Sequence, residues 1–157
     1  MKKIAVLFVC LGNICRSPAA EAIFINLLKK KGLTDGFIVD SAGTGSWHIG
    51  KKADSRMRIA AERRDINILS RARQIASKDF EEFNYILAMD DSNFRNIQDI
   101  KHRTSSNDFA SIKKIQNFRS VFNDQEVPDP YFGGDEGFEH VLDILEDSVS
   151  GFLESIS

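Results

Sequence analysis

Residues 4–18 read IAVLFVCLGNICRSP, and this stretch decides the class of fold. Ile4–Val9 is a continuous apolar run rich in β-branched residues, which is typical of a parallel strand that is buried on both faces. The loop after it contains Gly12, and Ser17 and Pro18 fit the N-cap and the first position of a helix. A strand that leads through a short loop into a helix indicates an α/β domain.

The rest of the chain alternates apolar segments with segments of helical spacing. We expect further strands at Phe37–Val39, Tyr85–Met89 and Lys114–Phe118. We expect helices from Ser17 to a C-cap at Gly32, over Asp54–Arg64, Ser77–Phe83 and Ser92–Ile100, and across the amphipathic stretch Phe138–Ile156. Residues 41–53 and 104–111 are expected to be loops, and Asp65 to end its helix in the left-handed conformation. Strands that alternate with helices predict a parallel sheet, which binds ligands at the carboxyl ends of its strands.

Charge is distributed unevenly along the chain. The 157 residues contain 21 Lys and Arg against 23 Asp and Glu, a net charge of −2, which argues against bulk binding of nucleic acid. Residues 121–157 hold 10 of the acids and no Lys or Arg, so residues 1–120 carry a net charge of +8. An electropositive body suits an anionic ligand, although a solvated acidic helix face explains the acidic segment equally well.

Several other classes of protein are excluded by composition and length. The size matches one ordinary domain, and no run approaches the about 18 apolar residues of a membrane span. The apolar run at the N-terminus is too short for a signal peptide, so we expect an intracellular protein with no membrane contact. Two cysteines, Cys10 and Cys15, cannot form a disulfide framework, and three scattered histidines lack the spacing of metal ligands. We therefore expect no metal site.

The loop from Cys10 to Ser17 carries the candidate chemistry. Its backbone N–H groups precede a helix N-terminus, where they can converge on an anion. Asn13 can adopt a positive φ and brace the loop, and the guanidinium of Arg16 matches two oxygens of a phosphate. Cys10 would lie at the mouth of this positive nest, which stabilises a thiolate. The alternative is a buried structural cysteine beside a surface arginine, but the order of strand, cysteine, glycine, arginine and helix start favours a nucleophile.

Five segments carry a recognisable pattern: VCLGNICRSPAAEA at Val9–Ala22, SAGTGSWHIG at Ser41–Gly50, RARQI at Arg71–Ile75, ILAMDDSN at Ile86–Asn93 and VPDPYFGG at Val127–Gly134. Together they resemble the low-molecular-weight protein tyrosine phosphatases over nearly the whole chain. The resemblance implies a four-stranded parallel sheet with helices on both faces and a phosphate-binding loop between the first strand and the first helix. It implies a single phosphatase domain over residues 1–157, cytoplasmic and cofactor-free, a monomer or weak dimer that acts on phosphotyrosine proteins.

The resemblance also assigns roles to individual residues. Cys10 is implied as the nucleophile, which forms a phosphocysteine, Arg16 as the phosphate clamp and Asp129 as the general acid. The implied phosphate-binding loop consists of Leu11, Gly12, Asn13, Ile14, Cys15, Arg16 and Ser17. Asn13, Ser17 and Ser41 would support the loop, and Leu11, Trp47 and Tyr131 would wall the cleft against the ring of the substrate.

Three side chains have competing interpretations. Trp47 is either a rim aromatic, which we favour, or a buried anchor, and His48 is expected to be solvated without a role. Cys15 is either a small residue that packs inside the loop or, as the resemblance favours, a partner that forms a reversible disulfide with Cys10 and protects it from over-oxidation.

The chain departs from the family pattern at three positions. Phe132 stands where a second tyrosine is frequent, Asp65 stands in place of glycine, and Ser70 stands in place of histidine.

Two other functions remain open at this stage. A thioredoxin-linked arsenate reductase shares the fold and a similar loop, but relays oxidation through further cysteines near the middle of the chain, and this sequence has none after Cys15. A catalytically inactive phosphate-binding module is the other alternative. The presence of Cys10, Arg16 and Asp129 together argues against it.

Overall fold

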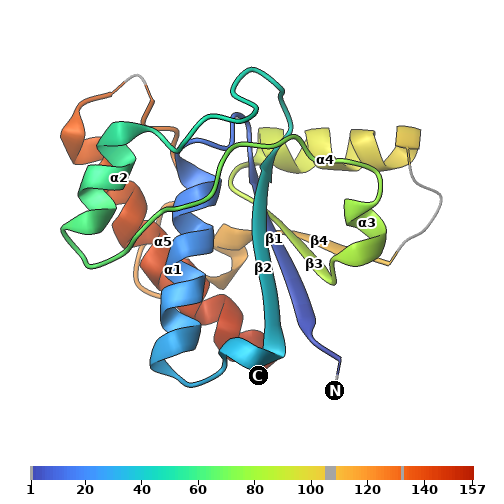
Figure 1. Ribbon diagram of the computed structural model, residues 1–157, viewed down its shortest axis with the longest axis horizontal. Coiled ribbons are helices and arrows are strands. Elements are labelled where there is room, and N and C mark those ends of the chain that lie inside the picture. The colour runs from blue at the N-terminus through green and yellow to red at the C-terminus, as the bar shows by residue number, and fades with distance from the viewer. Residues whose placement is uncertain (1, 105–108, 132) are drawn as a thin grey trace.

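A four-stranded parallel sheet in the order β2-β1-β3-β4 lies at the centre of the protein (Figure 1). The computed structural model describes residues 2–104, 109–131 and 133–157. The strands are β1 (Ile4–Cys10), β2 (Phe37–Gly43), β3 (Tyr85–Ala88) and β4 (Ser111–Lys114). β1 pairs with β2 along its whole length, from Ile4 opposite Phe37 to Cys10 opposite Gly43, and with β3 on its other edge. The predicted fold class is therefore confirmed.

Helices cover both faces of this sheet (Figure 1). One face is covered by α1 (Arg16–Lys30), α2 (Ser55–Glu62) and α5 (Asp135–Ile156), and the other by α3 (Asp79–Glu82) and α4 (Asp91–Thr104). Two short 3₁₀ helices, η1 (Thr34–Gly36) and η2 (Ile115–Phe118), precede β2 and follow β4. Because α5 docks on α1, the acidic residues of α5 lie on the side of the sheet that α1 covers.

The alternation of side chains along β1 explains why its sequence is apolar throughout. Val6, Phe8 and Cys10 belong to the hydrophobic core beneath α1 and α5, whereas Leu7 and Val9 belong to the core beneath α3 and α4. Successive side chains of a strand point to opposite faces, so a strand covered on both faces needs apolar residues at every position. This arrangement places Cys10 at the carboxyl end of the central strand.

The C-terminal end of α1 agrees with the prediction, and its N-terminal end does not. Gly32 has a φ of 68° and follows the C-cap residue Lys31, and the N–H of Leu33 donates to the carbonyl of Leu28 at 2.9 Å. These are the features of a Schellman motif, which glycine adopts without a Cβ penalty. At the other end Ser17 was expected to be the N-cap, and this is wrong: Cys15 occupies that position and makes no capping bond with its side chain.

Other element boundaries also need correction. A strand was expected over Lys114–Phe118, but β4 ends at Lys114. The 3₁₀ helix η2 occupies Ile115–Phe118 and places Ile115 in the core beneath α1 and α5. β2 continues to Gly43 into the expected loop, and α4 extends to Thr104 instead of ending at Ile100. Asp65 has the expected positive φ, 59°. Part of the loop expected at 104–111 lies outside the described residues.

No helix within the described ranges is both long enough and apolar enough to span a lipid bilayer.

Candidate active site

Cys10 ends β1 at the floor of a pocket of about 150 Å³. Its side chain is buried, and two polar groups contact its Sγ: the backbone N–H of Asn13 donates at 3.3 Å and Ser17 Oγ lies at 3.0 Å. The hydroxyl of Ser17 thus points back to the sulfur instead of capping α1. These two contacts fix the position of the sulfur at the carboxyl end of β1.

Arg16 opens α1 and is 3% exposed. Its Nη1 donates to Asp90 Oδ2 at 2.7 Å and to the carbonyl of Val127 at 3.0 Å, while Nη2 lies 3.7 Å from Asp129 Oδ2. Burial alone would lower the pKa of this guanidinium, but the charges of Cys10, Asp90 and Asp129 raise it above its ordinary value. Arg16 therefore stays charged, with one edge held by Asp90 and the other directed to the side of the pocket where Asp129 lies.

The loop between Cys10 and Arg16 holds unused backbone donors. The N–H groups of Gly12, Ile14 and Cys15 have no hydrogen-bond partner among the residues that the structure describes. Unpaired N–H groups next to a helix N-terminus form an anion-binding nest. The loop can therefore surround a tetrahedral oxyanion with backbone donors, and Arg16 adds its guanidinium.

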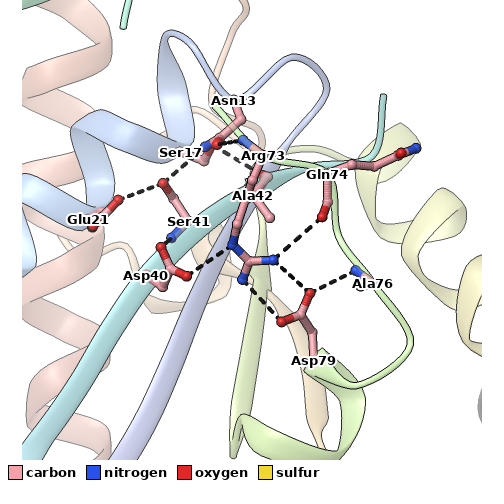
Figure 2. A network of polar contacts seen from close by, with 10 residues as sticks. All are labelled: Asn13, Ser17, Glu21, Asp40, Ser41, Ala42, Arg73, Gln74, Ala76 and Asp79. Atoms are coloured by element: carbon pink, nitrogen blue, oxygen red, sulfur yellow. Dashed lines mark hydrogen bonds and ion pairs between the residues drawn. The ribbon is translucent and has the colours of Figure 1, made fainter. Parts of the chain in front are cut away.

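The side chain of Asn13 braces this loop from behind (Figure 2). Its φ is 57°, a left-handed conformation that asparagine tolerates, and its Nδ2 donates to Ser17 Oγ at 2.8 Å and to Ser41 Oγ at 3.0 Å. Ser41 in turn donates to Glu21 Oε1 at 2.6 Å. Burial raises the pKa of Glu21, partly offset by the hydrogen bonds that Ser41 and Ser70 donate.

A second segment, Arg71–Ala76, closes the network from the far side (Figure 2). The backbone N–H of Arg73 donates to Asn13 Oδ1 at 3.0 Å, and the N–H of Gly43 donates to the carbonyl of Arg73 at 2.8 Å. The guanidinium of Arg73 is held by Asp40 at 3.0 Å and by both oxygens of the buried Asp79 at 3.0 and 3.1 Å. Gly43 must be glycine, because a Cβ there would lie 2.7 Å from the carbonyl oxygen of Leu11.

Aromatic and apolar side chains form the rim of the pocket. Trp47 is 68% exposed, which supports a rim position and not a buried anchor. Leu11 and Tyr131 are partly exposed beside it. Arg56 lies over the ring of Tyr131, 5.6 Å from its centroid, and donates to its carbonyl at 2.9 Å. The rim therefore offers an apolar wall for a flat ring above the anion-binding loop.

Cys15 lies in the wall of the pocket and is buried. Burial raises the pKa of its thiol strongly, and the nearby negative charges of Asp54, Cys10 and Asp129 add to that shift. Cys15 therefore stays a neutral thiol. Both cysteines are in the free thiol form.

The structure brings together every residue that the sequence singled out. The pocket is lined by Cys10, Leu11, Gly12, Ile14, Cys15, Arg16, Trp47, His48, Asp129 and Tyr131. Asn13, Ser17 and Ser41 lie directly behind it in the hydrogen-bond network. Across the described ranges, no group of three or more His, Cys, Asp or Glu side chains is placed to hold a metal ion.

Four participants in the site were missed. His48 was expected to be solvated without a role, but it lines the pocket, with its ring 6.3 Å from that of Tyr131. Asp90, Glu21 and Arg73 make the contacts described above, and no role had been assigned to them. All four belong to the quoted segments, and this membership was the available signal.

Comparison with known proteins gives consistent results. A family model described as low molecular weight phosphotyrosine protein phosphatase matches residues 5–157. The protein of that name from Schizosaccharomyces pombe is 43% identical over 157 residues, which cover 99% of each chain. A crystal structure of an Entamoeba histolytica protein tyrosine phosphatase superposes with a TM-score of 0.92 at 44% identity, covering 98% of this chain and 97% of the other. A Drosophila arginine phosphatase has a TM-score of 0.92 at 34% identity and covers 100% of this chain and 98% of its own.

Proposed function

The chain belongs to the low molecular weight phosphotyrosine protein phosphatase family and is a protein tyrosine phosphatase, and on this premise we propose that Cys10, Arg16 and Asp129 carry its reaction. Residues 1–157 act in this proposal as one phosphatase domain. The observation that carries it is the arrangement at Cys10: a buried sulfur with two polar contacts lies beneath a loop with free N–H groups and beside a buried arginine.

In the first step the Cys10 thiolate attacks phosphorus and the bond to the tyrosyl oxygen breaks. The phosphoryl group moves to sulfur, so a phosphocysteine forms and the reaction is divided into two easier steps. The N–H groups of Gly12, Ile14 and Cys15 and the guanidinium of Arg16 stabilise the equatorial oxygens of the transferring group. Asp90 fixes one edge of that guanidinium, which keeps its other edge directed to the substrate.

Asp129 is the proposed general acid. It protonates the leaving tyrosyl oxygen in the first step and accepts a proton from the attacking water in the second, which releases inorganic phosphate and restores the thiolate. Its Oδ1 accepts the N–H of Tyr131 at 3.1 Å and its Oδ2 lies on the side of Arg16. Pro128 and Pro130 restrict the backbone on both sides, which supports a fixed direction for the carboxyl group.

Turnover of p-nitrophenyl phosphate by the wild type and by Cys10→Ser tests the proposal. The wild type should hydrolyse the ester. The variant should not, but it should still bind vanadate or phosphate, since the anion is held by backbone groups and Arg16. Measurable turnover by Cys10→Ser would exclude the covalent mechanism. Loss of anion binding in a folded variant would exclude the loop as the phosphate site.

The same assay addresses the other functions considered. An inactive phosphate-binding module would bind the anion without turnover, and an arsenate reductase would need an electron relay beyond Cys10 and Cys15. The Drosophila neighbour is named an arginine phosphatase. Leu11, Trp47 and Tyr131 line the rim here, and this apolar wall supports an aryl phosphate, so phosphotyrosine peptides should be hydrolysed faster than phosphoarginine peptides of the same sequence.

A cytoplasmic location and a monomeric or weakly dimeric state are part of the same proposal. They rest on what the family resemblance implies. Light scattering over a range of protein concentrations tests the second point. A stable dimer at the lowest concentration would contradict it.

A further inference from the structure

A second groove continues outward from the catalytic pocket along α4. It has a volume of about 560 Å³ and shares two walls, Leu11 and Trp47, with the pocket. Its outer part is lined by side chains of α4, among them Asn96, Asp99, His102 and Arg103. The groove is therefore continuous with the site that holds the phosphorylated ring, and none of these α4 residues lines that site.

The catalytic pocket is too small to hold more than a phosphorylated side chain. Its volume is about 150 Å³, so the peptide on either side of a phosphotyrosine must lie outside it. One of the ways out passes between Leu11 and Trp47 into the α4 groove.

Two charged side chains of α4 line this groove in the described part of the chain, the acid Asp99 and the base Arg103. Arg103 belongs to the last turn of α4 and supplies the positive charge at the outer end of the groove. The Nε of Arg103 donates to the carbonyl oxygen of Asp99 at 3.3 Å, which ties the base of the guanidinium to the helix. A guanidinium held in this way matches a carboxylate.

We propose that the α4 groove is a substrate subsite that binds an acidic side chain of the peptide flanking the phosphotyrosine through Arg103, and that the negative charge of Asp99 weakens this binding. This inference rests on the proposed function and extends it to the choice of substrate. The subsite contacts only the peptide that flanks the phosphotyrosine, so it does not change the rate at which small aryl phosphates are hydrolysed. Arg103 and Asp99 therefore have opposite effects on the same class of substrate.

The test compares phosphotyrosine peptides in which one Glu is moved through the four positions on each side, with an all-Ala flank as reference. The wild type should show a higher kcat/KM for Glu at one of these positions than for the all-Ala flank. Arg103→Gln should lower kcat/KM for that peptide about two- to fivefold, the range of an exposed ion pair, and Asp99→Asn should raise it by a similar factor. Arg95→Gln changes an exposed arginine of the same helix outside the groove and should have no effect.

The result that overturns the subsite is a wild type with no preference for Glu, or a preference that Arg103→Gln and Asp99→Asn both leave unchanged. p-Nitrophenyl phosphate separates the two proposals, because all four proteins should hydrolyse it equally. If none of them does, the proposed reaction fails. The subsite is then tested by binding of the same fluorescent peptides, measured by anisotropy, where Arg103→Gln should still weaken and Asp99→Asn still strengthen the Glu peptide.

Discussion

The backbone N–H of Arg73 donates to Oδ1 of Asn13 at 3.0 Å, across 60 residues of sequence. This bond fixes the orientation of the Asn13 amide, because the oxygen must face Arg73 and the nitrogen must then face Ser17 and Ser41. Ser17 accepts from Asn13, so its one hydroxyl hydrogen is shared between two neighbours, Cys10 Sγ at 3.0 Å and the carbonyl oxygen of Ala42 at 3.4 Å. The donor and acceptor roles of the Asn13 amide thus follow from one backbone contact.

Asn13→Asp removes the two N–H donors and keeps the shape and the acceptor for Arg73. We expect kcat for p-nitrophenyl phosphate to fall by about 10- to 100-fold, since leaving buried partners unsatisfied costs about 1–3 kcal/mol and a negative charge is added beside the thiolate. Gln74→Glu is the matched control, because it makes the same change on an exposed neighbour whose amide nitrogen donates to the carbonyl of Thr44. Equal losses in both variants would show that added charge alone, and not the orientation of Asn13, is responsible.

Arg16→Lys keeps the positive charge but cannot hold Asp90 and an oxyanion at once. We expect kcat to fall by about 10²- to 10³-fold, the loss typical of one oxyanion donor. Steady-state kinetics measure this, with Arg63→Lys, a change at an exposed arginine at the C-terminal end of α2, as the control. Near wild-type kinetics in Arg16→Lys would show that the guanidinium of Arg16 is not needed to hold the phosphate.

Asp129→Asn should slow hydrolysis of phosphotyrosine by about 10²- to 10⁴-fold, because the leaving oxygen loses its proton donor. The loss should shrink as the leaving group becomes more acidic, since a good leaving group departs without a proton. A series of aryl phosphates measures the dependence on leaving-group pKa. A constant loss across that series would make Asp129 a structural residue.

Cys15→Ser tests the redox expectation. Peroxide should oxidise Cys10 to a sulfenic acid, and attack by Cys15 would release water and form a disulfide that dithiothreitol reduces. Since burial raises the pKa of Cys15, its thiolate is scarce at neutral pH, and the advantage of the wild type in recovered activity should grow from about pH 7 to about pH 9. Equal recovery of both proteins at every pH, with no loss of two hydrogens in the wild-type peptide by mass spectrometry, would leave Cys15 as loop packing.

Glu21→Gln tests the buried carboxyl at the back of the network. Burial raises the pKa of Glu21 in the folded protein, so its ionisation is less favourable there than in the unfolded chain. As pH rises from the unfolded-state value of about 4.3 through the higher folded value, the wild type should lose stability relative to the variant. The charges facing Glu21 are Asp40, which adds to this effect, and Arg73, which opposes it.

Urea unfolding at about pH 4 and about pH 8 measures the difference. Glu154→Gln, an exposed change on α5, controls for the loss of one negative charge. The amide oxygen introduced by Glu21→Gln would still accept the Ser41 hydroxyl, so kcat should stay close to that of the wild type. A stability advantage of the wild type that increases with pH would contradict the assignment.

Some features of this protein could be predicted from local sequence. The apolar run Ile4–Val9, the loop composition and the helical spacing after it determine a strand, an anion-binding loop and a helix, because each depends on interactions between residues close in the chain. Likewise, Gly32 and Asp65 end their helices in the left-handed conformation that was expected of them. Cys10, Arg16 and Asp129 were found through residue type and motif, and the structure places them around one pocket.

Short, weakly patterned elements could not be predicted in the same way. β4 has one apolar residue, Ile112, in four positions, so its place in the chain depends on pairing with β3 and not on its own preference. Ser17 was assigned to a cap because serine commonly takes that position. The buried sulfur of Cys10 competes for the same hydroxyl, and only the folded loop brings the two together.

The sequence alone therefore determined which chemical groups the site contains, because a nucleophile, a guanidinium and a carboxyl are properties of single residues. Only the tertiary structure decided how these groups are held and directed. Asp90 reaches Arg16 across 74 residues, and Arg73 orients Asn13 across 60. Such contacts depend on which strands become neighbours and on how the segments after them pack, and hydrogen-bond direction is set only when both partners are fixed in space.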